Sequence, residues 1–256
     1  MTPSVTMEHR GPVAIVTLNR PDRRNGVTVE MCEELYQQLR ELPASDSRVV
    51  VLRGAGEDFS VGADLGGGGA DSSLPPTYER LHPIYHAATL LHSMPQVTIA
   101  AIDGGCAGAA MGWACACDFR FASTRAKFAT AFLRVGVSGD MGLVWSLVQI
   151  VGAAQARELL LFPQKLSAQE ALSLNLVSRV FEAEVLHEEV MELAEQLASS
   201  QQLPLRLMKA NLLSAERLDF EEYIEIESAR HLHVTSSPSF REGAGRLARG
   251  QGPSTS

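Results

Sequence analysis

The stretch that decides the fold comprises residues 99–123, which read IAAIDGGCAGAAMGWACACDFRFAS. An apolar segment is followed by a turn of glycine and alanine, then by a run of small residues and a second apolar segment. This order predicts a buried strand, a tight turn, a closely packed helix and another strand. Strands that alternate with helices in this way are typical of α/β folds.

The sequence on either side extends the alternation to about residue 180. Apolar runs at 13–18 (VAIVTL) and 49–52 (VVVL) predict short buried strands. In segments 29–42 and 78–93 the apolar residues recur at helical spacing, which predicts two amphipathic helices. The chain is therefore predicted to have an α/β fold with βαβ units.

Beyond that point the pattern becomes helical. Ser167 and Glu170 have the spacing of a capping box, which predicts the start of a short helix. Segments 184–199 and 204–217 predict two long helices, and Asp219 is expected to begin another. We therefore expect a mixed α/β region followed by a helical C-terminal region.

Composition limits the classes of partner. With 256 residues and 45% hydrophobic content, the chain is large enough for one extensive core. A net charge of -8 argues against nucleic acid or an anionic membrane as the main partner, although a few local arginines suffice to bind an anionic ligand. The four cysteines lack paired zinc-ligand spacing, so no metal site is expected. The N-terminus has no apolar signal-like segment, which predicts a cytoplasmic protein.

Two segments carry a resemblance to a known family. Residues 99–123 resemble IAAVNGxAxGGGxELALACDxRIAS, a pattern of the crotonase (enoyl-CoA hydratase/isomerase) superfamily. Residues 126–152, AKFATAFLRVGVSGDMGLVWSLVQIVG, resemble that superfamily's AKFGxPExxxGxxPGxGGxxRLxRxVG. The resemblance extends over roughly residues 8–248, nearly the whole chain.

The resemblance implies an architecture and a ligand. Residues 1–195 are expected to form a crotonase (ClpP-like) spiral of ββα units, and 196–250 a helical region that packs against other subunits. A homotrimer or a dimer of trimers is implied, and residues 251–256 are expected to be a disordered tail. The implied substrate is an acyl-CoA thioester, with coenzyme A as part of the substrate and no tightly bound cofactor.

Enolate chemistry next to a thioester requires fixed hydrogen-bond donors at the developing oxyanion. In the superfamily, one donor N–H belongs to the alanine of an F-x-x-G-A-D segment, matched here by Ala63 in FSVGAD (59–64). The second belongs to the middle residue of a glycine turn, matched by Ala109 in GAA (108–110). The resemblance therefore implies an oxyanion hole formed by the Ala63 and Ala109 N–H groups. The alternative is a tight turn whose small residues serve only packing.

Segment 19–25, NRPDRRN, resembles the superfamily's CoA-binding turn, LNRPxxxNA. Arg23 or Arg24 could pair with CoA phosphates, because guanidinium groups match phosphate oxygens. The backbone of Ala63, Asp64, Leu65 and Gly66 would hold the adenine and pantetheine, and Ala109 the thioester. The alternative is an ordinary exposed basic turn. Weaker candidates for the phosphates are Lys127, Arg246 and Arg249.

The positions of the two hydratase glutamates are occupied by Gly112 and Phe132. Hydration of an enoyl thioester requires an acid and a base around one water, and neither residue can transfer a proton. The sequence therefore predicts that hydration by the usual route is inefficient.

Asp140, in the turn VSGDMG (137–142), is the best replacement. A similar turn occurs in the superfamily's 4-chlorobenzoyl-CoA dehalogenases, where the aspartate attacks the ring, and glycine likewise replaces the first glutamate. The dehalogenase tryptophan corresponds to Phe132, and its histidine aligns only loosely with His86. As an alternative, Asp140 is the N-cap of the helix that follows it. The residue is therefore interpreted as a base or nucleophile, as a helix cap, or as both.

The other candidates carry less information. His82 and His86 lie four residues apart on one predicted helix, but without a supporting carboxylate they are interpreted as surface histidines. His86 remains a candidate acid or base because of its pKa range. Trp113 and Trp145 are expected in the core or a pocket wall. Phe132 and Trp145 would suit an apolar or ring-bearing acyl group.

The sequence thus favours Asp140-assisted isomerisation, hydrolysis or carbon–carbon cleavage of a bulky or cyclic acyl-CoA. Two alternatives stay open: a non-catalytic acyl-CoA-binding protein, and a slow hydratase that relies on the oxyanion hole alone. The acyl group itself is not defined by the sequence, because its binding is expected to depend on the predicted loop 66–76 and the helix after it.

Overall fold

The computed structural model describes residues 2–64, 66, 78–237 and 240, with the side chains of 78–83 left out. A six-stranded sheet forms its centre, in the order β1-β2-β3-β4-β6-β9. Only β1 is antiparallel to its neighbour; the remaining pairs are parallel. The strands of this sheet are β1 Val5–Arg10, β2 Val13–Leu18, β3 Val49–Gly54, β4 Val97–Ile102, β6 Phe119–Ser123 and β9 Arg179–Phe181.

A second, three-stranded sheet lies in the order β5-β7-β8. Its strands are β5 Gly105–Ala107, β7 Lys127–Ala129 and β8 Leu166–Ser167. The α-helices are α1 Val29–Glu41, α2 Tyr78–Ser93, α3 Gly108–Ala116, α4 Leu143–Leu161, α5 Ala168–Ser173, α6 Leu186–Ala198, α7 Gln202–Ala215 and α8 Phe220–Thr235. Strands and helices alternate as far as β9, and only helices follow in the described residues, so the predicted α/β order is confirmed.

Both faces of the large sheet are covered. Along β2, Ala14 and Val16 belong to the larger apolar cluster, which includes side chains from α1, α2 and α3. Val13 and Ile15 point the other way, into a cluster completed by α6. Because successive side chains of a strand alternate between faces, a strand that is apolar throughout must be covered on both sides. This explains why VAIVTL and VVVL are continuous apolar runs.

The chain begins with an edge strand that the sequence analysis did not predict. β1 pairs with β2 across a hairpin in which Gly11 has a φ of +53°. Only Val5 of this strand is fully buried, and its second half is exposed. The segment therefore lacks the apolar run that marked the other strands of the sheet.

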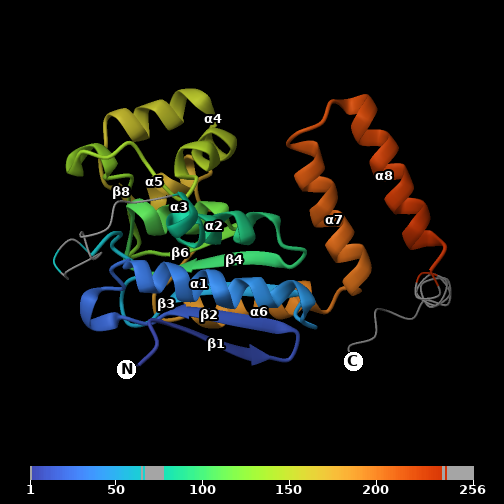
Figure 1. The fold of residues 1–256 in the computed structure, drawn as a ribbon, viewed down its shortest axis with the longest axis horizontal. Coiled ribbons are helices and arrows are strands. Elements are labelled where there is room, and N and C mark those ends of the chain that lie inside the picture. The colour runs from blue at the N-terminus through green and yellow to red at the C-terminus, as the bar shows by residue number, and fades with distance from the viewer. Residues whose placement is uncertain (1, 65, 67–77, 238–239, 241–256) are drawn as a thin grey trace.

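α7 and α8 form a helical pair that stands beside the α/β core (Figure 1). α7 is joined to the core by Lys209, whose Nζ lies 2.8 Å from Asp118 Oδ2 and donates to the Gln96 carbonyl at 2.7 Å. The predicted boundary at 195 falls inside α6, which packs on the sheet and ends at Ala198.

The predicted capping box is present at α5. Ser167 Oγ accepts the Glu170 N–H, and Glu170 Oε2 accepts the Ser167 N–H at 2.7 Å. We expect Ser167→Ala to lower the free energy of unfolding by about 1 kcal/mol, because the helix loses its side-chain cap. Urea denaturation checks this value against Ser173→Ala, an exposed serine at the end of the same helix. An equal, small loss in both variants would contradict the capping role.

Candidate active site

The two segments expected to form the oxyanion hole lie side by side. β5 leads directly into α3, and Ala109 is buried in the first turn of that helix, where backbone N–H groups have no intrahelical acceptor. Residues 60–63 run alongside β5, and Ser60 forms a β-bridge with Cys106. Gly62 has a φ of +86°, and a Cβ built on it would lie 2.8 Å from the Ala107 carbonyl oxygen. Ala63 is therefore placed next to the Ala107–Ala109 turn.

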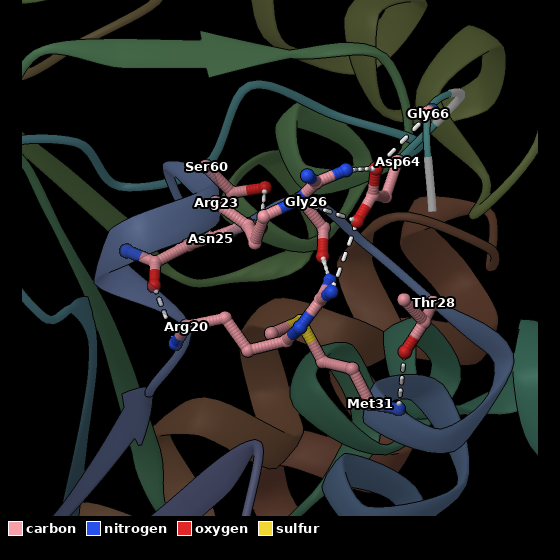
Figure 2. A network of polar contacts seen from close by, with 9 residues as sticks. All are labelled: Arg20, Arg23, Asn25, Gly26, Thr28, Met31, Ser60, Asp64 and Gly66. Atoms are coloured by element: carbon pink, nitrogen blue, oxygen red, sulfur yellow. Dashed lines mark hydrogen bonds and ion pairs between the residues drawn. The ribbon is translucent and has the colours of Figure 1, made fainter. Parts of the chain in front are cut away.

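The basic turn forms a polar network with the Ala63–Gly66 segment (Figure 2). Asp64 accepts hydrogen bonds from Arg23 Nη2 at 2.8 Å and from Arg20 Nη2 at 2.9 Å. These bonds, from Arg23 first and then Arg20, hold the pKa of the Asp64 carboxyl well below its usual range. The Gly66 N–H also donates to Asp64. The network ties the turn to the segment expected to hold CoA.

Arg23 and Arg24 diverge from each other. The Arg23 side chain is 49% exposed, and its guanidinium lies close to Gly66. Arg24 instead donates from Nε to Asp58 Oδ2 at 2.7 Å, and the same carboxylate accepts the Gly105 N–H. Of the two candidates, Arg23 is the one beside the Ala63–Gly66 backbone.

Asn25 organises this turn and was not singled out from the sequence. It is fully buried and has a φ of +53°, a conformation that asparagine tolerates better than most residues. Its side chain accepts the Arg20 N–H at 2.8 Å and donates to the carbonyls of Ala55 and Asp58. The sequence signal for this role was an asparagine directly after the basic turn. Once buried, its polar side chain must form hydrogen bonds, here with the backbone of neighbouring segments.

Gly112 and Phe132, which the resemblance is expected to align with the two hydratase glutamates, both border the Asp140 turn. A Cβ built on Gly112 would lie 2.6 Å from Met141 Cβ, so residue 141 fills the space beside that helical position. A Cβ built on Gly139 would lie 3.8 Å from the Phe132 ring. The residues before and after Asp140 therefore lie against Phe132 and Gly112, respectively.

Phe132 also connects this turn to the candidate oxyanion hole. A Cβ built on Gly108 would lie 3.8 Å from Phe132 Cε1, on the ring that also meets Gly139. The Phe132 ring therefore lies between Gly108, which precedes Ala109, and Gly139, which precedes Asp140. The structure thus brings Ala63, Ala109 and Asp140 into one region.

The N-cap interpretation of Asp140 is wrong. α4 begins at Leu143, its N-cap is Gly142, and no side chain caps it. The Asp140 backbone carbonyl accepts the Leu143 N–H, but its Oδ1 is buried and has no hydrogen-bond partner among the described residues. Burial raises the pKa of the Asp140 carboxyl. The Asp140 carboxyl group is therefore partly shielded from water, and its Oδ1 accepts no hydrogen bond from the described residues.

Cys32 of α1 belongs to the same region. Burial raises the pKa of its thiol to about 12, and the negative charge of Asp140 contributes to the rise. A thiol with such a pKa stays protonated at neutral pH and provides apolar packing rather than chemistry.

Two adjoining cavities lie behind the turn. The first, of about 270 Å³, is lined in part by Met141, Gly142 and Tyr85. The second, of about 410 Å³, reaches Lys209 of α7 and shares His92 and Trp145 with the first. Trp145 is 46% exposed and forms part of both walls, whereas Trp113 is fully buried in the core. Both linings combine apolar side chains with charged ones, such as Asp118 and Lys209 in the second cavity and Arg217 in the first.

Other predicted residues are placed elsewhere. His86 Nδ1 lies 3.4 Å from Thr89 Oγ1, and His86 is not among the residues that line the two cavities. Lys127 is an exposed residue of β7. Leu65, Arg246 and Arg249 lie outside the described residues, as do loop 67–77 and the tail. In the part of the chain that the structure describes, no helix is long and apolar enough to cross a membrane.

The spiral of strands and helices, with its C-terminal helical pair, defines the crotonase fold class. The enoyl-CoA hydratase/isomerase family model matches residues 8–251, and the chain belongs to this family. It is an acyl-CoA-processing enzyme of the crotonase superfamily.

Curated relatives extend over nearly the whole chain. The 1,2-epoxyphenylacetyl-CoA isomerase of Escherichia coli K12 is 31% identical over 248 residues, which cover 94% of each protein. A 4-chlorobenzoyl coenzyme A dehalogenase of an Arthrobacter species is 30% identical over 247 residues, which cover 93% of this chain and 88% of that protein.

Solved structures agree with the fold. An enoyl-CoA hydratase from Bacillus anthracis aligns with a TM-score of 0.90 at 27% identity over 98% of each chain. A candidate enoyl-CoA hydratase from Thermobifida fusca, in complex with CoA, aligns with a TM-score of 0.85 at 31% identity. That alignment covers 91% of this chain and 93% of the other.

Proposed function

We propose that Asp140 is the general base of an acyl-CoA isomerisation. Its carboxylate removes a proton from a carbon activated by the thioester, and the electron pair of the broken C–H bond moves to the thioester oxygen. The N–H groups of Ala63 and Ala109 stabilise the resulting enolate. Return of the proton to another carbon completes the isomerisation without any other reactant.

The observation that carries this proposal is the position of Asp140 between the two vacant glutamate positions. Met141 occupies the space beside Gly112, and the Phe132 ring lies against Gly139. This arrangement supports a site that works with one carboxylate in place of the two of a hydratase. One carboxylate can take up and return a proton, but hydration requires both an acid and a base around a water molecule.

The protonation state of Asp140 also suits a base. Desolvation raises the pKa of its carboxyl, which strengthens the ionised form as a proton acceptor. Its Oδ1 has no hydrogen-bond partner in the described structure, so a substrate C–H would not have to displace one.

The proposed substrate is an acyl-CoA with a bulky or ring-bearing acyl group. The two cavities behind the turn, of about 410 and 270 Å³ and sharing the Trp145 side chain, support this substrate class. The names of two relatives, an epoxyphenylacetyl-CoA isomerase and a chlorobenzoyl-CoA dehalogenase, point to the same class of acyl group.

The test is a mass-spectrometric screen of the wild type against crotonyl-, long-chain enoyl-, cyclic β-keto- and aryl-CoA thioesters, with Asp140→Asn beside it. A second assay follows deuterium uptake from D₂O into the α-carbon of phenylacetyl-CoA. Isomerisation or α-exchange that depends on Asp140 supports the proposal. Tight binding without turnover or exchange favours a binding protein, and hydration of crotonyl-CoA in both proteins favours a slow hydratase.

A covalent ester on Asp140 after incubation with 4-chlorobenzoyl-CoA would assign the aspartate as a nucleophile and overturn the base. Peptide mass mapping detects such an ester directly. 4-Chlorobenzoyl-CoA is the probe because one relative is a 4-chlorobenzoyl coenzyme A dehalogenase.

Arg23 is proposed to contact the CoA phosphates from beside Gly66. Because the side chain is half exposed and already paired with Asp64, we expect Arg23→Ala to weaken the binding of CoA thioesters only modestly. The KM for CoA thioesters should therefore rise about five-fold with kcat unchanged, and less at high salt. Arg10→Ala, which removes an exposed arginine of β1, is the control. An unchanged KM in Arg23→Ala would exclude the contact.

The C-terminal helices are proposed to mediate a trimer or a dimer of trimers. They expose large apolar side chains: Met208, Leu212, Phe220 and Leu232. Sedimentation of the wild-type protein measures the state, and a monomer at micromolar concentration would contradict the proposal.

A further inference from the structure

Gly112 is an unusual residue for its place. It lies fully buried inside α3, where glycine is less favourable than alanine, and its neighbours along the helix are alanine, methionine and tryptophan. A Cβ at this position would approach Met141 Cβ to 2.6 Å and the Met141 carbonyl oxygen to 2.9 Å. Both distances are shorter than ordinary contacts, so any side chain at 112 must move residue 141. The glycine is what permits the close approach.

Met141 is unusual in its backbone. Its φ is +48°, a region that residues with a Cβ seldom adopt, and its side chain is only 4% exposed. Gly139 and Gly142 on either side also have positive φ values, of +119° and +70°. Glycine tolerates these angles, whereas methionine is held there by its surroundings. The buried Met141 therefore anchors a sharply bent turn against α3.

Asp140 lies between these fixed points. Its predecessor Gly139 packs against Phe132, and its successor Met141 packs against Gly112. Because the backbone is fixed on both sides, the direction of the Asp140 side chain is set by these two contacts. Moving Met141 away from α3 would rotate or expose the carboxylate.

We propose that Gly112 and Met141 are positioning residues that hold the Asp140 carboxylate in its partly dry place. This inference rests on the proposed function of Asp140 as the base. Residue 112 must then be glycine so that the Asp140 turn can pack against α3. The glycine is needed for this packing, in addition to replacing a glutamate. The same contact explains why a glutamate restored at 112 would disturb the site.

The test uses Gly112→Ala, Met141→Gly and the double variant, with Gly136→Ala as a control. Gly136 lies in the same connection at a φ of +77°, and a Cβ there would meet nothing within 4 Å. The readouts are kcat, KM and the acid limb of the pH profile for deuterium exchange into phenylacetyl-CoA. Asp140→Asn is measured in parallel.

In Gly112→Ala we expect kcat to fall about 10- to 100-fold, since a displacement of about 1 Å in a catalytic group has effects of this size. KM should stay within about three-fold. The acid limb should move to lower pH, because a displaced carboxyl becomes better solvated and its pKa falls. In the double variant, glycine at 141 removes the colliding Cβ but leaves the carbonyl oxygen of residue 141 2.9 Å from the new side chain, so kcat should recover only in part relative to Gly112→Ala. If Gly112→Ala does not fold, the same shift of the acid limb is required of Met141→Gly.

The two proposals fail in different ways. If Asp140→Asn abolishes exchange but Gly112→Ala behaves like Gly136→Ala, the positioning role is wrong and the base stands. The positioning role is also wrong if Gly112→Ala loses activity without a shift of the acid limb and without recovery in the double variant. The substitution then has only a structural effect, and the assignment of Asp140 as the base is unaffected. If exchange is the same in Asp140→Asn as in the wild type, the proposed function itself fails.

Discussion

Replacing Asp140 with asparagine is expected to slow deuterium exchange into phenylacetyl-CoA by about 10²–10⁴-fold, the usual contribution of a general base. Asparagine has nearly the same shape but cannot accept the proton. The oxyanion donors and the CoA turn are untouched, so KM should change by less than about three-fold. Exchange is followed by mass spectrometry, and KM is taken from its concentration dependence.

The pH dependence supplies an independent check. Desolvation raises the pKa of the Asp140 carboxyl, so the ionised base is formed at a higher pH than an exposed aspartate would require. The acid limb of kcat/KM in the wild type should therefore lie above the ordinary aspartate value, and it should be missing in the asparagine variant. An acid limb at the ordinary value would contradict a partly dry carboxyl.

The same burial has a consequence for stability. Because the folded-state pKa is raised, the folded protein binds the proton more tightly than the unfolded chain does. Stability is then lost as pH rises from the ordinary aspartate pKa through the raised one, and the loss persists at neutral pH. Asp140→Asn should therefore gain stability relative to the wild type as pH rises through this window. Thermal denaturation of both proteins across that window measures the difference.

If Asp140→Asn loses exchange and is more stable than the wild type at neutral pH, Asp140 serves function and lowers the stability of the fold. Loss of exchange together with lower stability at all pH values would instead indicate a structural role. Glu182→Gln, an exposed carboxylate whose Oε2 accepts from Thr124, is the control for removing a negative charge.

Much of the fold could be predicted because its signals are local. Strands β2 and β3 each contain a run of four apolar residues, and α1 has apolar residues at helical spacing with a Thr28 cap. The capping box at α5 and the Asp219 cap at α8 also lie within one turn of sequence. β1 carries no such local pattern, because an edge strand with an exposed second half is specified by its pairing with β2.

The candidate site was predictable only in part. The turns around Ala63 and Ala109 are short motifs, so sequence could locate them. The packing of Met141 against Gly112 joins segments about thirty residues apart, and nothing local in either segment signals it. The helix-cap interpretation of Asp140 was wrong for a similar reason: positive φ values at Met141 and Gly142 delay the start of α4 by two residues.

The largest effect outside Asp140 is expected from Gly62→Ala, which should lower the exchange rate by about 10²–10³-fold, the effect of removing one oxyanion donor. The φ of +86° at Gly62 disfavours any residue with a Cβ, and that Cβ would lie 2.8 Å from the Ala107 carbonyl oxygen. Both effects push residue 62 away from the Ala107–Ala109 turn, and the N–H of Ala63 moves with it.

Gly11→Ala is the matched control, because Gly11 has a φ of +53° in the β1–β2 hairpin and a Cβ there would meet nothing within 4 Å. It imposes a similar backbone strain without a collision, so it should lose some stability and no activity. Exchange within a few-fold of the wild type in folded Gly62→Ala would show that the Ala63 N–H does not stabilise the enolate. Combining Gly62→Ala with Asp140→Asn should cost less than the product of the single effects, since the base and the oxyanion donors act on one proton transfer.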